Sequence, residues 1–193
     1  MMHLIGLWAK NRVIELIKEM DVMNIEPLKV SRVQGNTPAS STCTSGKVSA
    51  FLKQMIADGK LTPGSVQGCS PAEIEAIEKS FGTPLPSEYK DFLQLIGKSA
   101  GNLFRGSTMH YHDLRNLLEL QEDAQALLES NEFSPLPKTA FVFFMHQGYT
   151  FSYFLLNDGD DPAVYQFCEG QKSTTFDKPW NTFSEFLKNF IGQ

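Results

Sequence analysis

The sequence SPAEIEAIEKSFGTPLPSEYKDFL, residues 70–93 of a 193-residue chain, predicts two helices joined by a short extended segment. Ser70 supplies an N-cap, Pro71 takes the first helical position and Glu73 stands three residues after the cap, which together form the pattern of a capping box. Apolar residues follow at helical spacing, and Gly82 supplies the glycine that commonly ends a helix. We therefore expect the first helix to end at Gly82.

The second helix is separated from the first by Pro84 and Pro86, because each proline pushes the residue before it into extended geometry. We expect Ser87 to cap this helix and Gly97 to end it. Its inner face carries large apolar side chains at helical spacing. These are Tyr89, Phe92, Leu93 and Ile96.

Further along the chain the apolar period changes from helical to extended. Residues 48–58 and a stretch from an Asp113 cap to about residue 128 predict helices, and residues 181–191 predict a closing one. A strand or hairpin arm is predicted at residues 103–112, and strands rich in Phe, Tyr and Val are predicted at residues 140–146, 149–156 and 163–168. Helices followed by a run of strands and a closing helix predict an α+β fold, in which helices pack around a mainly antiparallel, twisted sheet.

Residues 1–46 differ in character from the rest of the chain. Residues 8–24 approximate a modest amphipathic helix, and residues 31–46 are small, polar and rich in Ser and Thr, as linkers are. The sequence therefore predicts an N-terminal helix and linker over residues 1–46 and a globular domain over residues 47–193.

Charge and cysteine content narrow the class of protein. The net charge is +3 over residues 1–69 and −8 over residues 70–193, which argues against nucleic acid as the main partner. The aromatic strands of residues 140–170 contain no Lys or Arg, so packing explains them better than base stacking does. Three distant cysteines (Cys43, Cys69 and Cys168) rule out a disulfide framework within one chain and fit a reducing compartment. With no apolar run of membrane-spanning length and no leader peptide, we expect a cytoplasmic protein with no membrane partner.

No motif in the sequence predicts a metal or a cofactor. The segment Gly97-Lys98-Ser99 lacks the first glycine of a phosphate-binding loop, since position 92 is Phe. His110 and His112 share one face of a predicted strand but have no third ligand at metal-binding spacing. The acidic run 157–161 lacks the twelve-residue spacing and the final Glu of a calcium loop, and is predicted to be a hairpin turn.

The candidates for nucleophilic catalysis are Cys43, Cys69, Cys168 and several Ser, none of which stands in a catalytic motif, and the most suggestive single residue is His146. His146 ends an apolar strand just before Gln147-Gly148, where a histidine that hydrogen-bonds backbone groups across the hairpin is the better interpretation. Cys168 has no His nearby in sequence, and no Gly-x-Ser-x-Gly elbow exists. A small hydrolase using His146 or Cys168 remains an alternative.

The order of these motifs resembles that of the SUKH superfamily, the bacterial immunity proteins related to the fungal SMI/KNR cell-wall assembly regulators. The resemblance rests on the stretch of residues 71–93, with its acidic helix, Gly, Leu-Pro and following Tyr and Phe-Leu. It continues in His146-Gln147-Gly148-Tyr149, in Asp161-Pro162, in Glu169-Gly170 and in the closing helix. It covers about residues 48–191. The sequence departs from the family where Gly97-Lys98-Ser99 stands in place of a frequent Asn-Gly.

The resemblance implies a non-enzymatic protein that binds and neutralises a cognate toxin domain, often a nuclease. An acidic domain suits such a partner, because nucleases carry basic surfaces. The expected partner contacts are Asp158, Asp160, Asp161 and Glu169, placed on one side of the strand hairpins, together with His146 and Tyr149. The alternative from a different class is an intracellular scaffold domain that recruits several proteins, with residues 1–46 as a docking arm.

Overall fold

The computed structural model describes residues 46–191. The predicted helix at residues 8–24 and nearly all of the predicted linker lie outside these residues, so the division of the chain at residue 46 stays a prediction. The described part has an α+β fold, as the sequence predicts, with five α-helices and two antiparallel sheets. The helices are α2 (Lys47–Ala57), α3 (Pro71–Phe81), α4 (Ser87–Ile96), α5 (Leu114–Ser130) and α6 (Phe183–Ile191).

The larger sheet is a five-stranded antiparallel meander in the order β3-β4-β5-β6-β7. Its strands are β3 (Ser107–Thr108), β4 (Ala140–His146), β5 (Thr150–Leu155), β6 (Val164–Cys168) and β7 (Asp177–Trp180). The smaller sheet pairs β1 (Val66–Gln67) with β2 (Ser99–Ala100). A short 3-10 turn, η1 (Pro63–Ser65), precedes β1.

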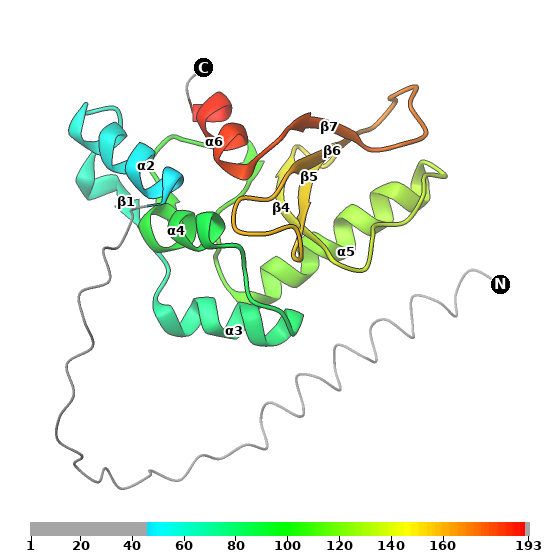
Figure 1. The fold of residues 1–193 in the computed structure, drawn as a ribbon. Coiled ribbons are helices and arrows are strands. Elements are labelled where there is room, and N and C mark those ends of the chain that lie inside the picture. The colour runs from blue at the N-terminus through cyan, green and yellow to red at the C-terminus, as the bar shows by residue number, and fades with distance from the viewer. Residues whose placement is uncertain (1–45, 192–193) are drawn as a thin grey trace, which may run out of the picture. The chain divides into compact units, whose positions relative to one another are not determined.

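The large sheet is covered on both faces, as Figure 1 shows. Helix α5 lies along one face, and α4 and α6 cover the other, with α2 packed against both of these helices. Two apolar clusters fill the two interfaces, the larger on the α4 and α6 side. Phenylalanine dominates the larger cluster: Phe92, Phe141, Phe143, Phe154, Phe183 and Phe186 are all at most 1% exposed.

Strand β4 contains a bulge and is buried on both faces. Its register against β5 shifts between Val142 and Phe144, so the side chains around the shift do not strictly alternate. Phe143 and Phe144 both pack into the larger cluster, while Val142 and Met145 pack under α5. A strand buried on both faces cannot show the polar–apolar alternation of a half-buried strand.

Helix α5 also completes the edge of β4 beyond the short strand β3. The Gln121 side-chain amide accepts from Val142 N and donates to Val142 O, each at 2.8 Å. One side chain therefore replaces a neighbouring strand at this position and leaves no open backbone pair for another chain to bind.

The local signals of residues 70–93 act largely as predicted. Ser70 and Glu73 form the capping box of α3, and Gly82 ends the helix in the left-handed conformation at φ 66°. Ser87, however, is not the cap of α4: the cap position is Pro86, without a side-chain bond, and Ser87 is the first helical residue. Glu88 N instead donates to Asp160 O at 3.1 Å, so a distant loop satisfies this donor of the first turn.

The prediction for residues 103–112 is wrong in extent. Only Ser107 and Thr108 form a strand, because the chain before them turns through positive φ at Gly101, Phe104 and Gly106. The strand β7 was not predicted. Its four residues include Pro179, which lacks a backbone donor and is tolerated on an edge strand but contributes no strand signal.

Candidate partner-binding surface

The β4–β5 turn places His146 and Tyr149 together at one end of the large sheet. Gln147 and Gly148, between them, have φ of 49° and 79°, and Tyr149 N donates to His146 O at 3.2 Å. Positive φ at both central positions is the signature of a type I′ hairpin turn, which explains the Gln-Gly pair. The turn therefore has one defined backbone conformation, with the two aromatic side chains flanking it.

Three side chains form a contact chain at this turn. Ser107 Oγ lies 2.8 Å from His146 Nδ1, and the His146 ring lies 5.8 Å from the Tyr149 ring at an interplanar angle of 83°. Tyr149 is 39% exposed, the one large hydrophobic side chain among residues 46–191 that is exposed. An exposed tyrosine held by its neighbours suits a binding contact, because tyrosine adds contact area at low entropic cost.

Glu169 belongs to the same end of the sheet. Its backbone N donates to Tyr149 O at 2.8 Å, directly beyond the pair formed by Thr150 and Cys168. Asn131, just after α5, reaches Glu169 Oε1 at 3.5 Å. Glu169 therefore lies beside Tyr149 and next to the C-terminal end of α5.

The three aspartates of the β5–β6 loop lie at the opposite end of the sheet. Asp161 is engaged within the domain: its carboxylate accepts from Ser184 N at 2.9 Å and from Ser184 Oγ at 2.8 Å, and pairs with Lys47 Nζ at 3.0 Å. Asp158 accepts from Ala163 N at 3.2 Å. The predicted contact Asp161 is therefore a structural residue that joins the loop to the start of α6.

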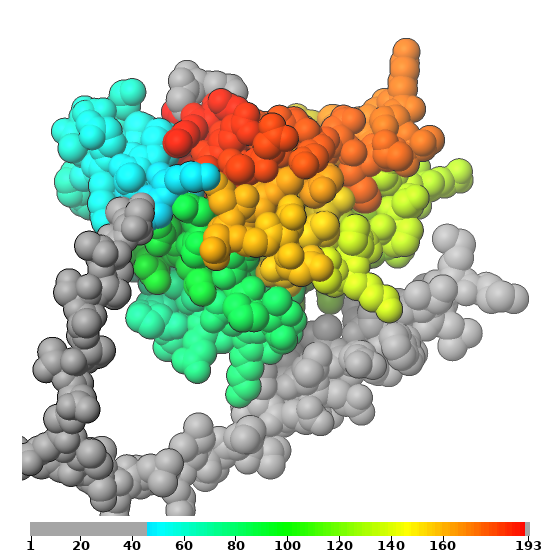
Figure 2. Space-filling model, in the orientation of Figure 1, coloured from blue at the N-terminus to red at the C-terminus, as the bar shows by residue number. Residues whose placement is uncertain are grey.

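The loop is tied to α2 through a second buried carboxylate. Glu88, 8% exposed, accepts from Lys47 N at 2.9 Å and from Val48 N at 2.7 Å, so it caps the N-terminus of α2. Figure 2 shows the β5–β6 loop in contact with the start of α2. The Asp161 carboxylate raises the pKa of Lys47 by hydrogen bonding and by its charge. Sequence analysis missed Glu88, because nothing local distinguishes it from the less buried glutamates of α3.

The six predicted contact residues thus fall into two groups. His146, Tyr149 and Glu169 share one end of the sheet, and the three aspartates share the other. A strand of six residues spans about 20 Å, which separates the two groups. The expectation that Glu169 and the aspartates lie on one side of the hairpins is therefore wrong, because antiparallel β6 carries the chain across the whole sheet between them.

The candidates for metal binding and catalysis differ in their contacts, and the buried Nδ1 of His110 has no hydrogen-bond partner within residues 46–191. Residues 46–191 contain no group of three or more His, Cys, Asp or Glu side chains placed to hold a metal ion. His110 packs its ring against Phe104, and burial lowers the pKa of this imidazole. Cys168 Sγ accepts from Thr150 Oγ1 at 3.3 Å. Within the described part, no carboxylate hydrogen-bonds to His146, so the pair of His146 and Ser107 lacks the orienting group of a catalytic triad.

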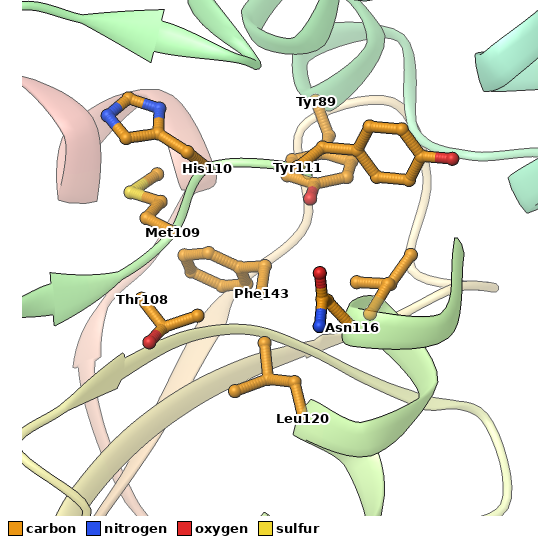
Figure 3. A pocket seen from close by; sticks show the side chains of 9 residues that line it. Tyr89, Thr108, Met109, His110, Tyr111, Asn116, Leu120 and Phe143 are labelled. Carbon is orange, nitrogen blue, oxygen red and sulfur yellow. The ribbon is translucent and has the colours of Figure 1, made fainter. Parts of the chain in front are cut away.

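A small cavity lies beneath α5, between it, β3 and α4. Figure 3 shows side chains such as Tyr89, Asn116 and Phe143 converging on it. Its volume is about 20 Å³, enough for one water molecule and far below the volume of a substrate pocket. This cavity does not offer a substrate site.

The motif of residues 70–93 lies within a region of the chain that matches a known protein family. Residues 68–189, more than half of the chain, match the SMI1 / KNR4 family (SUKH-1). The chain belongs to the SMI1/KNR4 (SUKH-1) family. The match begins just before α3, so α2 lies outside the matched region. Glu88, which lies inside that region, nevertheless caps α2. A search of curated proteins finds no match. No helix in residues 46–191 has the length and apolar character needed to cross a membrane.

Proposed function

We propose that this SUKH-1 protein is an immunity protein that binds a basic toxin domain and blocks it. Its family includes immunity proteins and cell-wall assembly regulators, as the sequence resemblance implies. The observation that carries the more specific function is the charge of the domain. Residues 47–193 hold 18 Asp and Glu against 12 Lys and Arg, a net charge of −6, and residues 113–170 hold 10 against 2. Such a surface attracts the basic surface of a nuclease, which must hold a polyanion.

The proposed action is binding rather than catalysis, in the cytoplasm of the cell that makes the protein. Support comes from the environment of the catalytic candidates, since His146 is bonded to Ser107 without an orienting carboxylate and Cys168 is engaged with Thr150. Blocking a nuclease needs only that the complex covers the surface to which nucleic acid binds. No cofactor or metal enters this proposal.

The test is a pull-down from the native cell's lysate with the full-length chain as bait, at about 50 mM and about 500 mM salt, with mass spectrometry of the retained proteins. We expect one dominant basic partner whose retention falls at high salt, because the Debye length shrinks from about 14 Å to about 4 Å over this range. The purified partner should lose its activity when the chain is added in equimolar amount. Several weak partners and no inhibited activity would instead favour the scaffold alternative.

A further inference from the structure

The two groups of predicted contacts differ in how many of their side chains are exposed and not already bonded within the domain. At the β5–β6 loop, Asp161 is fully engaged within the domain and Asp158 bonds the loop backbone, whereas Asp160 is exposed and its side chain makes no bond among residues 46–191. At the opposite end, the Tyr149 ring is 39% exposed and Glu169 is exposed with a single long contact at 3.5 Å. The end of the sheet with the turn of residues 147–148 therefore combines an exposed aromatic ring with an exposed carboxylate, whereas the loop at the other end offers the Asp160 carboxylate without such a ring.

The backbone at this end is also unusual. Three non-glycine residues in the described part of the chain have positive φ: Phe104 at 61°, Glu132 at 53° and Gln147 at 49°. Phe104 precedes β3, which pairs with the end of β4, and Glu132 follows Asn131, which contacts Glu169. All three thus lie around one end of the sheet. Such conformations are disfavoured for side chains with a Cβ, so the turn and the packing around this end must hold them in place.

The electrostatics of this end favour a cation. Glu169 N donates to Tyr149 O, and Asn131 at the end of α5 contacts the Glu169 carboxylate, so both residues lie near the C-terminal end of α5. The C-terminal end of α5 carries the negative end of the helix dipole, and its last turn has no basic residue to offset it. The carboxylates of Glu129 and Glu132 add to the same field.

We propose that Tyr149 and Glu169 receive an arginine side chain of the protein partner, with the guanidinium stacked on the Tyr149 ring and paired with the Glu169 carboxylate. This inference rests on the proposed function and specifies the contact through which a basic partner binds. Arginine fits better than lysine, because its planar guanidinium can stack on a ring and bind a carboxylate through two parallel hydrogen bonds. Ser107 and His146 act as positioning residues that keep the Tyr149 ring in place before binding.

The test uses full-length, ¹⁵N-labelled protein and a hexa-arginine peptide at low salt, with a hexa-lysine peptide for comparison. We expect the largest amide shifts at residues 147–150 and 168–170, and tighter binding of hexa-arginine than of hexa-lysine. Tyr149→Leu should weaken hexa-arginine binding about 3-fold, the loss expected for an exposed cation–π contact, while Tyr149→Phe should retain it. Each variant is on the surface, and its amide spectrum reports whether the fold is retained.

The control that decides the matter is a pair of variants with equal charge change. Glu169→Gln and Asp160→Asn each remove one negative charge, at opposite ends of the sheet. General attraction of a polycation predicts equal effects, whereas the proposed contact predicts a loss of about 3-fold for Glu169→Gln and almost none for Asp160→Asn. Equal losses, shifts centred on residues 157–161, or no peptide binding would overturn the proposed contact. The proposed function is judged separately by the pull-down, whose outcome does not depend on these variants.

Discussion

The buried carboxylate of Glu88 offers the sharpest test of how this domain is held together. Its two oxygens accept from the backbone N–H groups of Lys47 and Val48, at 2.9 and 2.7 Å, and its side chain is almost completely removed from solvent. Glu88→Ala leaves both donors of α2 without an acceptor, and Val48 is fully buried, so water cannot readily replace the carboxylate there.

The size of the effect follows from these bonds. A hydrogen bond to a charged group contributes roughly 1.5–3 kcal/mol, and loss of an N-cap costs about 1 kcal/mol by itself. The hydrogen-bond and N-cap values describe the same two bonds and are not simply added. We therefore expect Glu88→Ala to lower the free energy of unfolding by about 3–4 kcal/mol, out of a total of roughly 5–15 kcal/mol for a domain. For a domain of this size, 1 kcal/mol corresponds to about 2–4 °C in Tm.

The assay is urea and thermal unfolding of the full-length chain followed by far-UV circular dichroism, with Glu75→Ala as the matched control. Glu75 is an exposed residue of α3 whose side chain makes no hydrogen bond or ion pair with residues 46–191, so its substitution should change the free energy of unfolding by less than about 0.5 kcal/mol. A loss below about 1 kcal/mol for Glu88→Ala, or one equal to that of the control, would refute the assigned capping role.

Three further predictions concern other parts of the fold. Gly97→Ala should lower the free energy of unfolding, measured in urea, by about 1–3 kcal/mol, because the added Cβ would lie 2.5 Å from a backbone oxygen of α4. Gly64 has open space around it, so the control variant Gly64→Ala should lower it by less than about 0.5 kcal/mol. Gln121→Leu removes two hydrogen bonds from the edge of β4, so it should lower the free energy of unfolding by about 2 kcal/mol and raise light scattering from aggregates on mild heating. Unchanged stability and scattering would show that Gln121 does not protect this edge. The Lys98 ammonium, with further help from the N-terminus of α3, lowers the pKa of Glu73 to about 2. This pKa lies below that of the unfolded chain, so the associated stability is present above about pH 4.5 and is lost as the pH falls toward 2. Glu73→Gln should therefore flatten the dependence of the urea midpoint on pH between 5 and 2, and an unaltered slope would contradict this.

The helices and central strands could be predicted from sequence because their signals are local. The capping box of Ser70 and Glu73, the Asp113 cap of α5 and the Gln147-Gly148 turn each act within four residues, and all three appear in the structure. Elements without such signals were missed or overextended. Strand β7 exists because β6 offers it a partner, and residues 103–106 turn because positive φ at Phe104 is stabilised by packing that its own sequence does not reveal.

The candidate site divides in the same way. The sequence predicted partner contacts in the acidic loop and in the His146–Tyr149 turn. Residues distant in sequence decided which of these side chains are bonded within the domain and which stay free to bind a partner. The Asp161 carboxylate is bonded to Ser184 and Lys47, which lie 23 and 114 residues away in the sequence, whereas Tyr149 remains exposed beside Glu169.

The amino-acid sequence by itself determined the family, the α+β class and most element boundaries, because capping, turn chemistry and apolar period depend on neighbouring residues. Only the tertiary structure decided that Glu88 caps α2, that Gln121 closes the edge of β4, and that the predicted contacts lie at two ends of the sheet. Those outcomes depend on which distant backbone donors and acceptors become buried together and must find partners, and no local pattern encodes that pairing.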